Sequence, residues 1–128
     1  MLRSIFLACL GGALGSGFRL VITTFVVSRF GTGFPYATMG INIAGCFLIG
    51  FIAELSRLRT GFNPDLRLFL MAGILGGFTT FSSFSYDVVT LFARSEYFST
   101  MVYVLGSVAV GITAAFVGMS LVRTMAGA

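Results

Sequence analysis

The sequence predicts an all-α integral membrane protein with four transmembrane helices. The chain has 128 residues, of which 57% are hydrophobic and only 9% are charged. A soluble domain of this size cannot hide so much apolar surface, because small domains leave a large fraction of their surface in water. Four apolar segments, each with the roughly 20 residues needed to cross a bilayer, are separated by short joints. The whole chain, 1–128, is therefore interpreted as a single transmembrane channel domain.

The first two helices are expected to be continuous. The first is predicted over residues 2–28, and the joint 29–35 that follows it contains glycines and a proline, which end helices. The second is predicted over residues 36–55. It is followed by the joint 56–65, which is rich in charges and turn residues. Both segments are apolar enough to lie in lipid.

The third helix is expected to be interrupted, and the fourth continuous. The third is predicted over residues 66–92, where a Gly-Gly pair precedes an uncharged alternation of hydroxyls and phenyl rings. A backbone group freed from a helix in hydrocarbon needs another partner. A break near 76–80 is therefore expected to face protein, water or an ion. The fourth helix is predicted over residues 97–122.

Small residues recur at spacings that allow close helix packing in lipid. They are Gly11 and Gly15, Gly40 and Ala44, and the stripe of Ser107, Gly111 and Ala115. The partner helix of each stripe can lie in the same chain or in another. Four helices alone can hardly enclose a polar pathway and also bury its wall, so a homo-oligomer is inferred.

The charges are few and lie mostly near predicted helix ends. All eight cations are arginine, and the net charge is +4. Four crossings place both termini on one side, and the arginine bias leans toward that side being cytoplasmic. The bias is weak enough to permit insertion in both orientations. A positive charge suits anionic lipid headgroups, whereas the scattered arginines exclude a nucleic-acid partner.

Catalysis is excluded by the shortage of titratable groups. The chain has no histidine, and Asp87 is the only carboxylate well inside a helix. No nucleophile has a base at a recognisable spacing. Arg19 comes out at a depth similar to that of Asp87. The arginine is expected either to contact Asp87 or to face a water-filled mouth and attract anions.

Polar side chains gather in the second and third helices. Asn42 lies deep in the second, where its amide serves either a helix–helix hydrogen bond or a pore. Five hydroxyls follow the Gly-Gly pair of the third: Thr79, Thr80, Ser82, Ser83 and Ser85. Capping of the restarted helix explains one or two of them. The rest favour a polar lining.

Two phenyl rings belong to the same run. Phe81 and Phe84 are three residues apart, so a helix would place them on one face. Packing against lipid is one interpretation of such rings. The other uses the positive ring edges, which can touch a small anion without holding it as tightly as an arginine would.

Three motifs stand out over this background: GGALGSGFR at 11–19, GINIAG at 40–45 and GILGGFTTFSSF at 73–84. Together they resemble the CrcB/Fluc family of fluoride channels, and the resemblance covers nearly the whole chain. Ser83 stands where threonine is common in that family and keeps the hydroxyl.

The resemblance implies a dual-topology, antiparallel homodimer in the bacterial inner membrane. Such proteins passively export fluoride, reject chloride and so lower fluoride toxicity. The implied partners are fluoride, membrane lipid and a second copy of the chain. The resemblance also implies a structural Na⁺ at the dimer interface.

The resemblance also assigns residues. The implied aromatic box consists of Phe81 and Phe84. The implied polar route consists of Asn42, Ser107, Thr80, Ser82 and Ser83, with Tyr103 nearby. The implied Na⁺ ligands are the backbone carbonyls of Gly76 and Thr79, and Arg19 would attract anions at the mouth.

Two other functions are weighed against this one. A small proton-coupled multidrug transporter relies on an acidic residue in its first helix, and this first helix has none. A non-transporting membrane scaffold would explain the small-residue stripes. It would leave the hydroxyl run and Asn42 unexplained.

Overall fold

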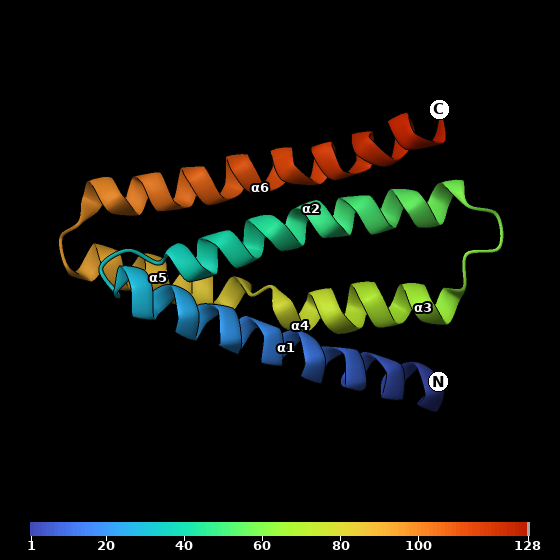
Figure 1. The fold of residues 1–128 in the computed structure, drawn as a ribbon. Coiled ribbons are helices and arrows are strands. Elements are labelled where there is room, and N and C mark those ends of the chain that lie inside the picture. The colour runs from blue at the N-terminus through green and yellow to red at the C-terminus, as the bar shows by residue number, and fades with distance from the viewer. Residues whose placement is uncertain (128) are drawn as a thin grey trace.

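The computed structural model describes residues 1–127, and within them the only regular elements are helices. Figure 1 shows α1, α2 and α6 as long helices and a third span that runs through α3, α4 and α5, with both termini at the same end of the molecule. The elements are α1 (Leu2–Phe30), α2 (Tyr36–Leu58), α3 (Pro64–Leu68), η1 (Phe69–Leu75), α4 (Gly76–Phe78), α5 (Phe81–Ala93) and α6 (Tyr97–Ala126). Four spans are long and apolar enough to cross a membrane, as the sequence predicts.

α1, α2 and α6 begin at the predicted residues, the third span begins two residues earlier than predicted, and all four spans end one to four residues beyond the predicted limits. α1 continues to Phe30 and stops at Gly31, whose φ of 74° is unfavourable for residues with a side chain. α3 begins at Pro64, because the Asn63 side chain accepts hydrogen bonds from the two backbone N–H groups that follow the proline. Helical backbone satisfies its own polar groups, so it continues past the apolar core of each segment.

The third span departs from α-helical backbone at two places. η1 is a π-helical stretch, and α4 ends at Phe78. Thr79 (ψ 158°) and Thr80 (ψ 120°) are extended before α5 begins at Phe81. The Gly-Gly pair itself is helical, so the extended residues lie at the C-terminal edge of the range 76–80. The axis of the span bends by only 18°.

Close packing joins the spans in two pairs. α1 lies against η1 and α4, and a Cβ atom added at Gly15 would overlap the backbone of Ile74. α2 lies against α6, where a Cβ atom at Gly118 would overlap the backbone of Phe47. The small residues of α1 and α6 therefore pack within the chain. A Cβ atom at Gly40 would meet nothing within 4 Å, so its stripe faces outward.

We expect Gly15→Ala to destabilise the protein by about 1–3 kcal/mol, because the new methyl group must push α1 away from Ile74 and Phe78. Gly17→Ala is the matched control on the same helix, since a Cβ atom there meets nothing within 4 Å. The control should be neutral or slightly stabilising. Thermal aggregation in detergent measures both variants. Equal stability of the two would contradict this packing.

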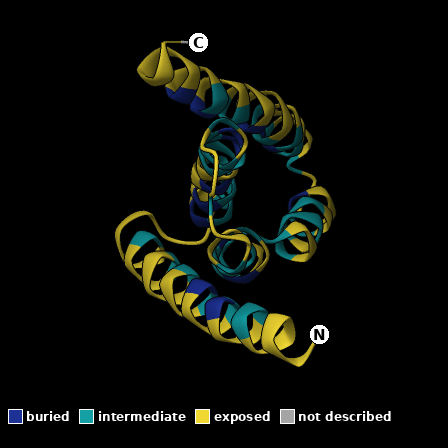
Figure 2. Ribbon diagram, turned by 90° about the vertical axis from the view of Figure 1, so that its right-hand side faces the viewer, coloured by how far each residue is buried: buried dark blue, intermediate teal, exposed yellow. Residues whose placement is uncertain are grey.

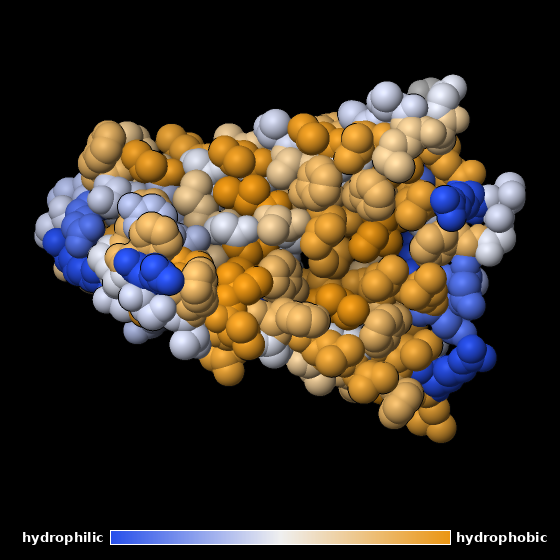
Figure 3. All heavy atoms as spheres, viewed as in Figure 1, coloured by the Kyte–Doolittle hydropathy of each residue, from blue (hydrophilic) through white to orange (hydrophobic). Residues whose placement is uncertain are grey.

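The surface is large for the size of the chain. It measures 8038 Å², against roughly 6,600 Å² expected for a soluble monomer of this mass. Buried residues are few and lie along the helix contacts (Figure 2). An apolar band separates hydrophilic residues at the two ends of the molecule (Figure 3). This distribution suits a protein surrounded by lipid.

Candidate functional site

A single side chain bonds the backbone where the third span is interrupted. Asn42 projects from α2, and its Nδ2 donates to the carbonyl oxygen of Thr80 at 3.1 Å. Its Oδ1 accepts from the backbone N–H of the same residue at 2.9 Å. The amide therefore replaces the helical bond that the Thr80 N–H would make, and it gives the N-cap carbonyl of Thr80 a second donor. The helix–helix interpretation of Asn42 is confirmed, and one amide hydrogen of its NH₂ group is left over.

The hydroxyl run begins with a helix cap. Thr80 Oγ1 accepts from the backbone N–H of Ser83 at 3.2 Å and so caps α5. The same oxygen lies 3.1 Å from Ser82 Oγ and 3.3 Å from Ser83 Oγ. The predicted capping role is thus confirmed for one threonine. The Ser82 and Ser83 hydroxyls form a small network with it at the start of α5. The hydroxyls of Thr79 and Ser85 donate instead to backbone carbonyls four residues earlier in the chain.

The interruption also frees backbone carbonyls. In a continuous helix, the carbonyl of Gly76 would accept from the N–H of Thr80, four residues on. That N–H donates to Asn42 instead. In the same way, the N–H of Ser83 bonds Thr80 Oγ1 and not the carbonyl of Thr79. The carbonyls of Gly76 and Thr79 therefore both lose their helical donors.

A groove of about 350 Å³ lies between α2, the third span and α6; we call it the Asn42 groove. It is lined by Asn42, Gly45, Cys46, Ile49, Met71, Leu75, Gly76, Thr79, Thr80, Phe81, Phe84, Ser107 and Val108. Within the residues that the structure describes, no side chain that lines this groove is charged. Five predicted route residues meet here: Asn42, Thr80, Phe81, Phe84 and Ser107. The structure adds Cys46 and Met71, which the sequence pattern did not single out.

Two features of this groove are suited to an anion. The rings of Phe81 and Phe84 lie 5.7 Å apart between centroids, and Phe81 is 79% exposed. Ser107 Oγ is buried and has no hydrogen-bond partner within residues 1–127. An unpaired buried hydroxyl is costly, so its free donor is available to a ligand.

Tyr103 lies behind the groove. It is fully buried, its ring is 5.2 Å from that of Phe84, and its hydroxyl donates to Asp87 Oδ2 at 3.0 Å. Asp87 therefore has a partner on α6. Within the described residues no ion pair joins it to Arg19, so the expectation of an Arg19–Asp87 contact is wrong. The tyrosine hydroxyl is nearer because α6 packs beside α5.

Arg19 and Ser83 line a different groove, of about 440 Å³, which we call the Arg19 groove. Thr80 lines both grooves, so the interrupted backbone separates them. The other predicted residue, Ser82, is exposed and lines neither groove. Arg19 thus lies close to the hydroxyl network from the opposite side.

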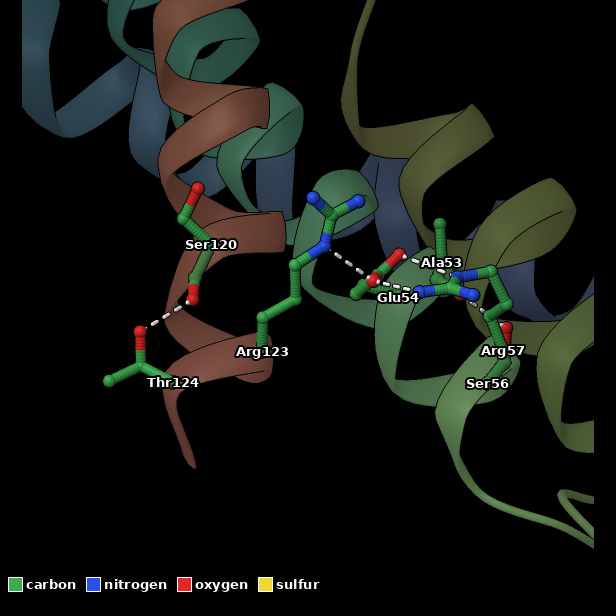
Figure 4. Close-up of polar contacts among 7 residues, drawn as sticks. All are labelled: Ala53, Glu54, Ser56, Arg57, Ser120, Arg123 and Thr124. Carbon is green, nitrogen blue, oxygen red and sulfur yellow. Dashed lines mark hydrogen bonds and ion pairs between the residues drawn. The ribbon is translucent and has the colours of Figure 1, made fainter. Parts of the chain in front are cut away.

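Sequence reasoning missed a cluster at the end where the termini lie (Figure 4). Glu54 is only 2% exposed and accepts from both Arg57 and Arg123. The sequence carried one signal for it, since Glu54 and Arg57 are three apart on one helix. Its burial by α6 had no local signal.

A family model and individual relatives both place this chain in one protein family. The family model described as "CrcB-like protein, Camphor Resistance (CrcB)" matches residues 6–119. A Rhizobium meliloti protein is 40% identical over 97% of this chain and 99% of its own length. Proteins of Agrobacterium fabrum (44% identical, 95% of this chain, 98% of its own length) and Rhodopseudomonas palustris (45%, 93% and 96%) are similar. All three carry the name "Fluoride-specific ion channel FluC".

Proposed function

This chain belongs to the CrcB-like family, and on that basis we propose that it is a fluoride-specific channel that passively exports fluoride across the bacterial inner membrane. The observation that carries the proposal is the Asn42 groove. Its wall combines an amide, hydroxyls and phenyl rings at the point where the backbone is interrupted.

Fluoride is small and strongly hydrated, so a path through lipid must replace its water with several weak donors. The Ser107 hydroxyl and the second amide hydrogen of Asn42 supply two of them. The ring edges of Phe81 and Phe84 supply weaker positive contacts. None carries a full charge, which allows the ion to leave again. A narrow bore then excludes larger halides.

The functional unit in this proposal is an antiparallel homodimer that inserts in both orientations. One observation supporting a second copy is the exposure of Phe81, whose ring lines the groove but is not covered on its outer side. A second copy would supply the wall that is missing there. Another is the outward-facing Gly40 stripe, which is suited to close packing. The weak arginine bias is compatible with either orientation.

We further propose that the carbonyls of Gly76 and Thr79 hold a structural Na⁺ at the dimer interface. The donor set fits, because carbonyl oxygens suit hard cations and both lack their helical donors. A bound cation would neutralise these oxygens and join two chains.

Removing sodium during purification is expected to dissociate the dimer, as measured by size-exclusion chromatography. Thr79→Val is the control, and it should retain the sodium dependence because the ligand is backbone. A dimer indifferent to sodium would contradict the assignment.

The function is tested by ion efflux. Vesicles that contain the purified protein are loaded with potassium fluoride or potassium chloride, and potassium is allowed to leave through an ionophore. A fluoride electrode should record rapid fluoride loss, whereas chloride stays inside. Vesicles that retain fluoride would overturn the proposal. Proton-coupled uptake of a lipophilic cation would instead favour the multidrug transporter.

A further inference from the structure

The buried acid of the terminal cluster is saturated by two arginines from different helices. Glu54 Oε1 accepts from Arg57 Nη2 at 2.6 Å and from Arg123 Nε at 2.7 Å. Glu54 Oε2 accepts from Arg57 Nε at 3.1 Å. A carboxylate this buried must be paired, because an isolated buried charge is very costly. Glu54 thereby fixes both guanidinium groups in place.

The two arginines retain free donors. The side chains of Arg57 and Arg123 are 63% and 50% exposed, whereas that of Glu54 is 2% exposed. In Figure 4 the two terminal nitrogens of Arg123 point away from the carboxylate. Two cations against one anion leave the cluster with one net positive charge. Its free N–H groups therefore form a preorganised positive surface.

This surface lies on the helix faces that line the Asn42 groove. Residues three or four apart on a helix are neighbours along one face. On α2 such a row runs through Cys46, Ile49, Ala53 and Arg57. On α6 a matching row runs through Val108, Ile112, Ala115, Met119 and Arg123. The first residues of both rows line the groove. Both rows thus lead from the groove to the arginine pair.

We propose that Arg57 and Arg123 form a collecting site for small inorganic anions at the terminal end of the Asn42 groove. This inference rests on the proposed fluoride channel and adds a site to it. Arg57 is eight residues from Ile49, or roughly 12 Å along α2. At that distance one net charge raises the local anion concentration without touching the narrow part of the path.

Glu54 sets the strength of this site. Two unpaired guanidinium groups would bind an anion bidentately and hold it, which would slow conduction. The carboxylate cancels one charge and accepts hydrogen bonds from the inward edge of each guanidinium group. The remaining single charge attracts anions and releases them.

The test compares charge removal in the cluster with charge removal beside it. Arg57→Gln and Arg123→Gln are assayed in vesicles of neutral phosphatidylcholine at low fluoride, with the salt of an impermeant anion setting the ionic strength. Arg59→Gln is the matched control, because it removes an exposed arginine at the same end that has no ion pair within residues 1–127. At about 10 mM salt the Debye length is ~30 Å, and at 1 M it is ~3 Å.

At low salt each cluster variant should conduct about 2–5-fold more slowly than the parent, and the control should match the parent. At high salt all four proteins should converge. Arg123→Lys keeps the charge but loses the planar fork, so it should keep the flux if attraction matters. A loss in Arg123→Lys as large as that in Arg123→Gln, or a loss that persists in 1 M salt, would mean a structural role and overturn the proposal.

Two further outcomes are separable. If the parent protein conducts fluoride and the cluster variants behave like Arg59→Gln, the collecting site is wrong while the channel function stands. If the variants differ from the parent only in vesicles that contain phosphatidylglycerol, the arginines bind lipid headgroups and the proposal fails.

Discussion

Phe81→Ile and Phe84→Ile are each expected to reduce fluoride efflux about tenfold or more while the protein still assembles. Both rings line the Asn42 groove beside Thr80. Isoleucine retains apolar bulk but has no quadrupole, so the weak positive contact with the anion disappears. A loss of about 1.4 kcal/mol at one point of the path is enough for a tenfold change in rate. Phe81 is mostly exposed, so its replacement costs little folding energy.

Phe92→Ile is the matched control, because Phe92 lies on the same helix, is 60% exposed and does not line the groove. Electrode-measured efflux from vesicles should be near that of the parent for this variant. Size-exclusion chromatography of all three variants checks assembly. Unchanged flux in both Phe81→Ile and Phe84→Ile would remove the rings from the mechanism.

The second large effect is expected at Asn42. Asn42→Ala removes the two hydrogen bonds that hold the N–H and the carbonyl of Thr80. The carbonyl of this N-cap residue keeps its helical donor, but the N–H is left without a partner, at a cost of about 1–3 kcal/mol. The interruption should then lose its fixed geometry, and the protein should both lose thermal stability and stop conducting.

Asn42→Asp separates the two roles of this residue. The aspartate keeps an oxygen that can accept from the Thr80 N–H, but it has no amide hydrogen for the anion. We expect its melting temperature in detergent to lie between those of Asn42→Ala and the parent, with efflux as low as in Asn42→Ala. Full conduction by Asn42→Asp would show that Asn42 holds the backbone and does not meet the ion.

Much of the fold follows from local composition. Four long apolar segments predict four membrane-crossing helices, and the structure has them at nearly the expected limits. The glycines of α1 predict close packing, and Gly15 lies against Ile74. These predictions succeed because a bilayer requires every segment to satisfy its own backbone, which leaves the helix as the only choice.

The hydrogen-bond partners of individual polar side chains did not follow from local composition. From its position alone Asn42 had two possible roles, and only the structure pairs it with Thr80, 38 residues later. Arg19 was expected to be able to reach Asp87, yet Asp87 accepts from Tyr103. A residue's position in the sequence indicates its depth along a helix, but it does not fix how that helix is rotated relative to its neighbours.

The sequence by itself determined that this is a four-helix membrane protein of the CrcB-like family, and it supplied the polar and aromatic residues of the proposed path. The tertiary structure decided which of these residues share the Asn42 groove, where the third span becomes extended, and that Glu54 is buried under Arg123. The physical reason is the range of the forces. Helix formation in lipid depends on neighbours within a turn or two. Side-chain partners depend on how helices distant in the sequence cross, which is set by close contacts such as that of Gly15 with Ile74.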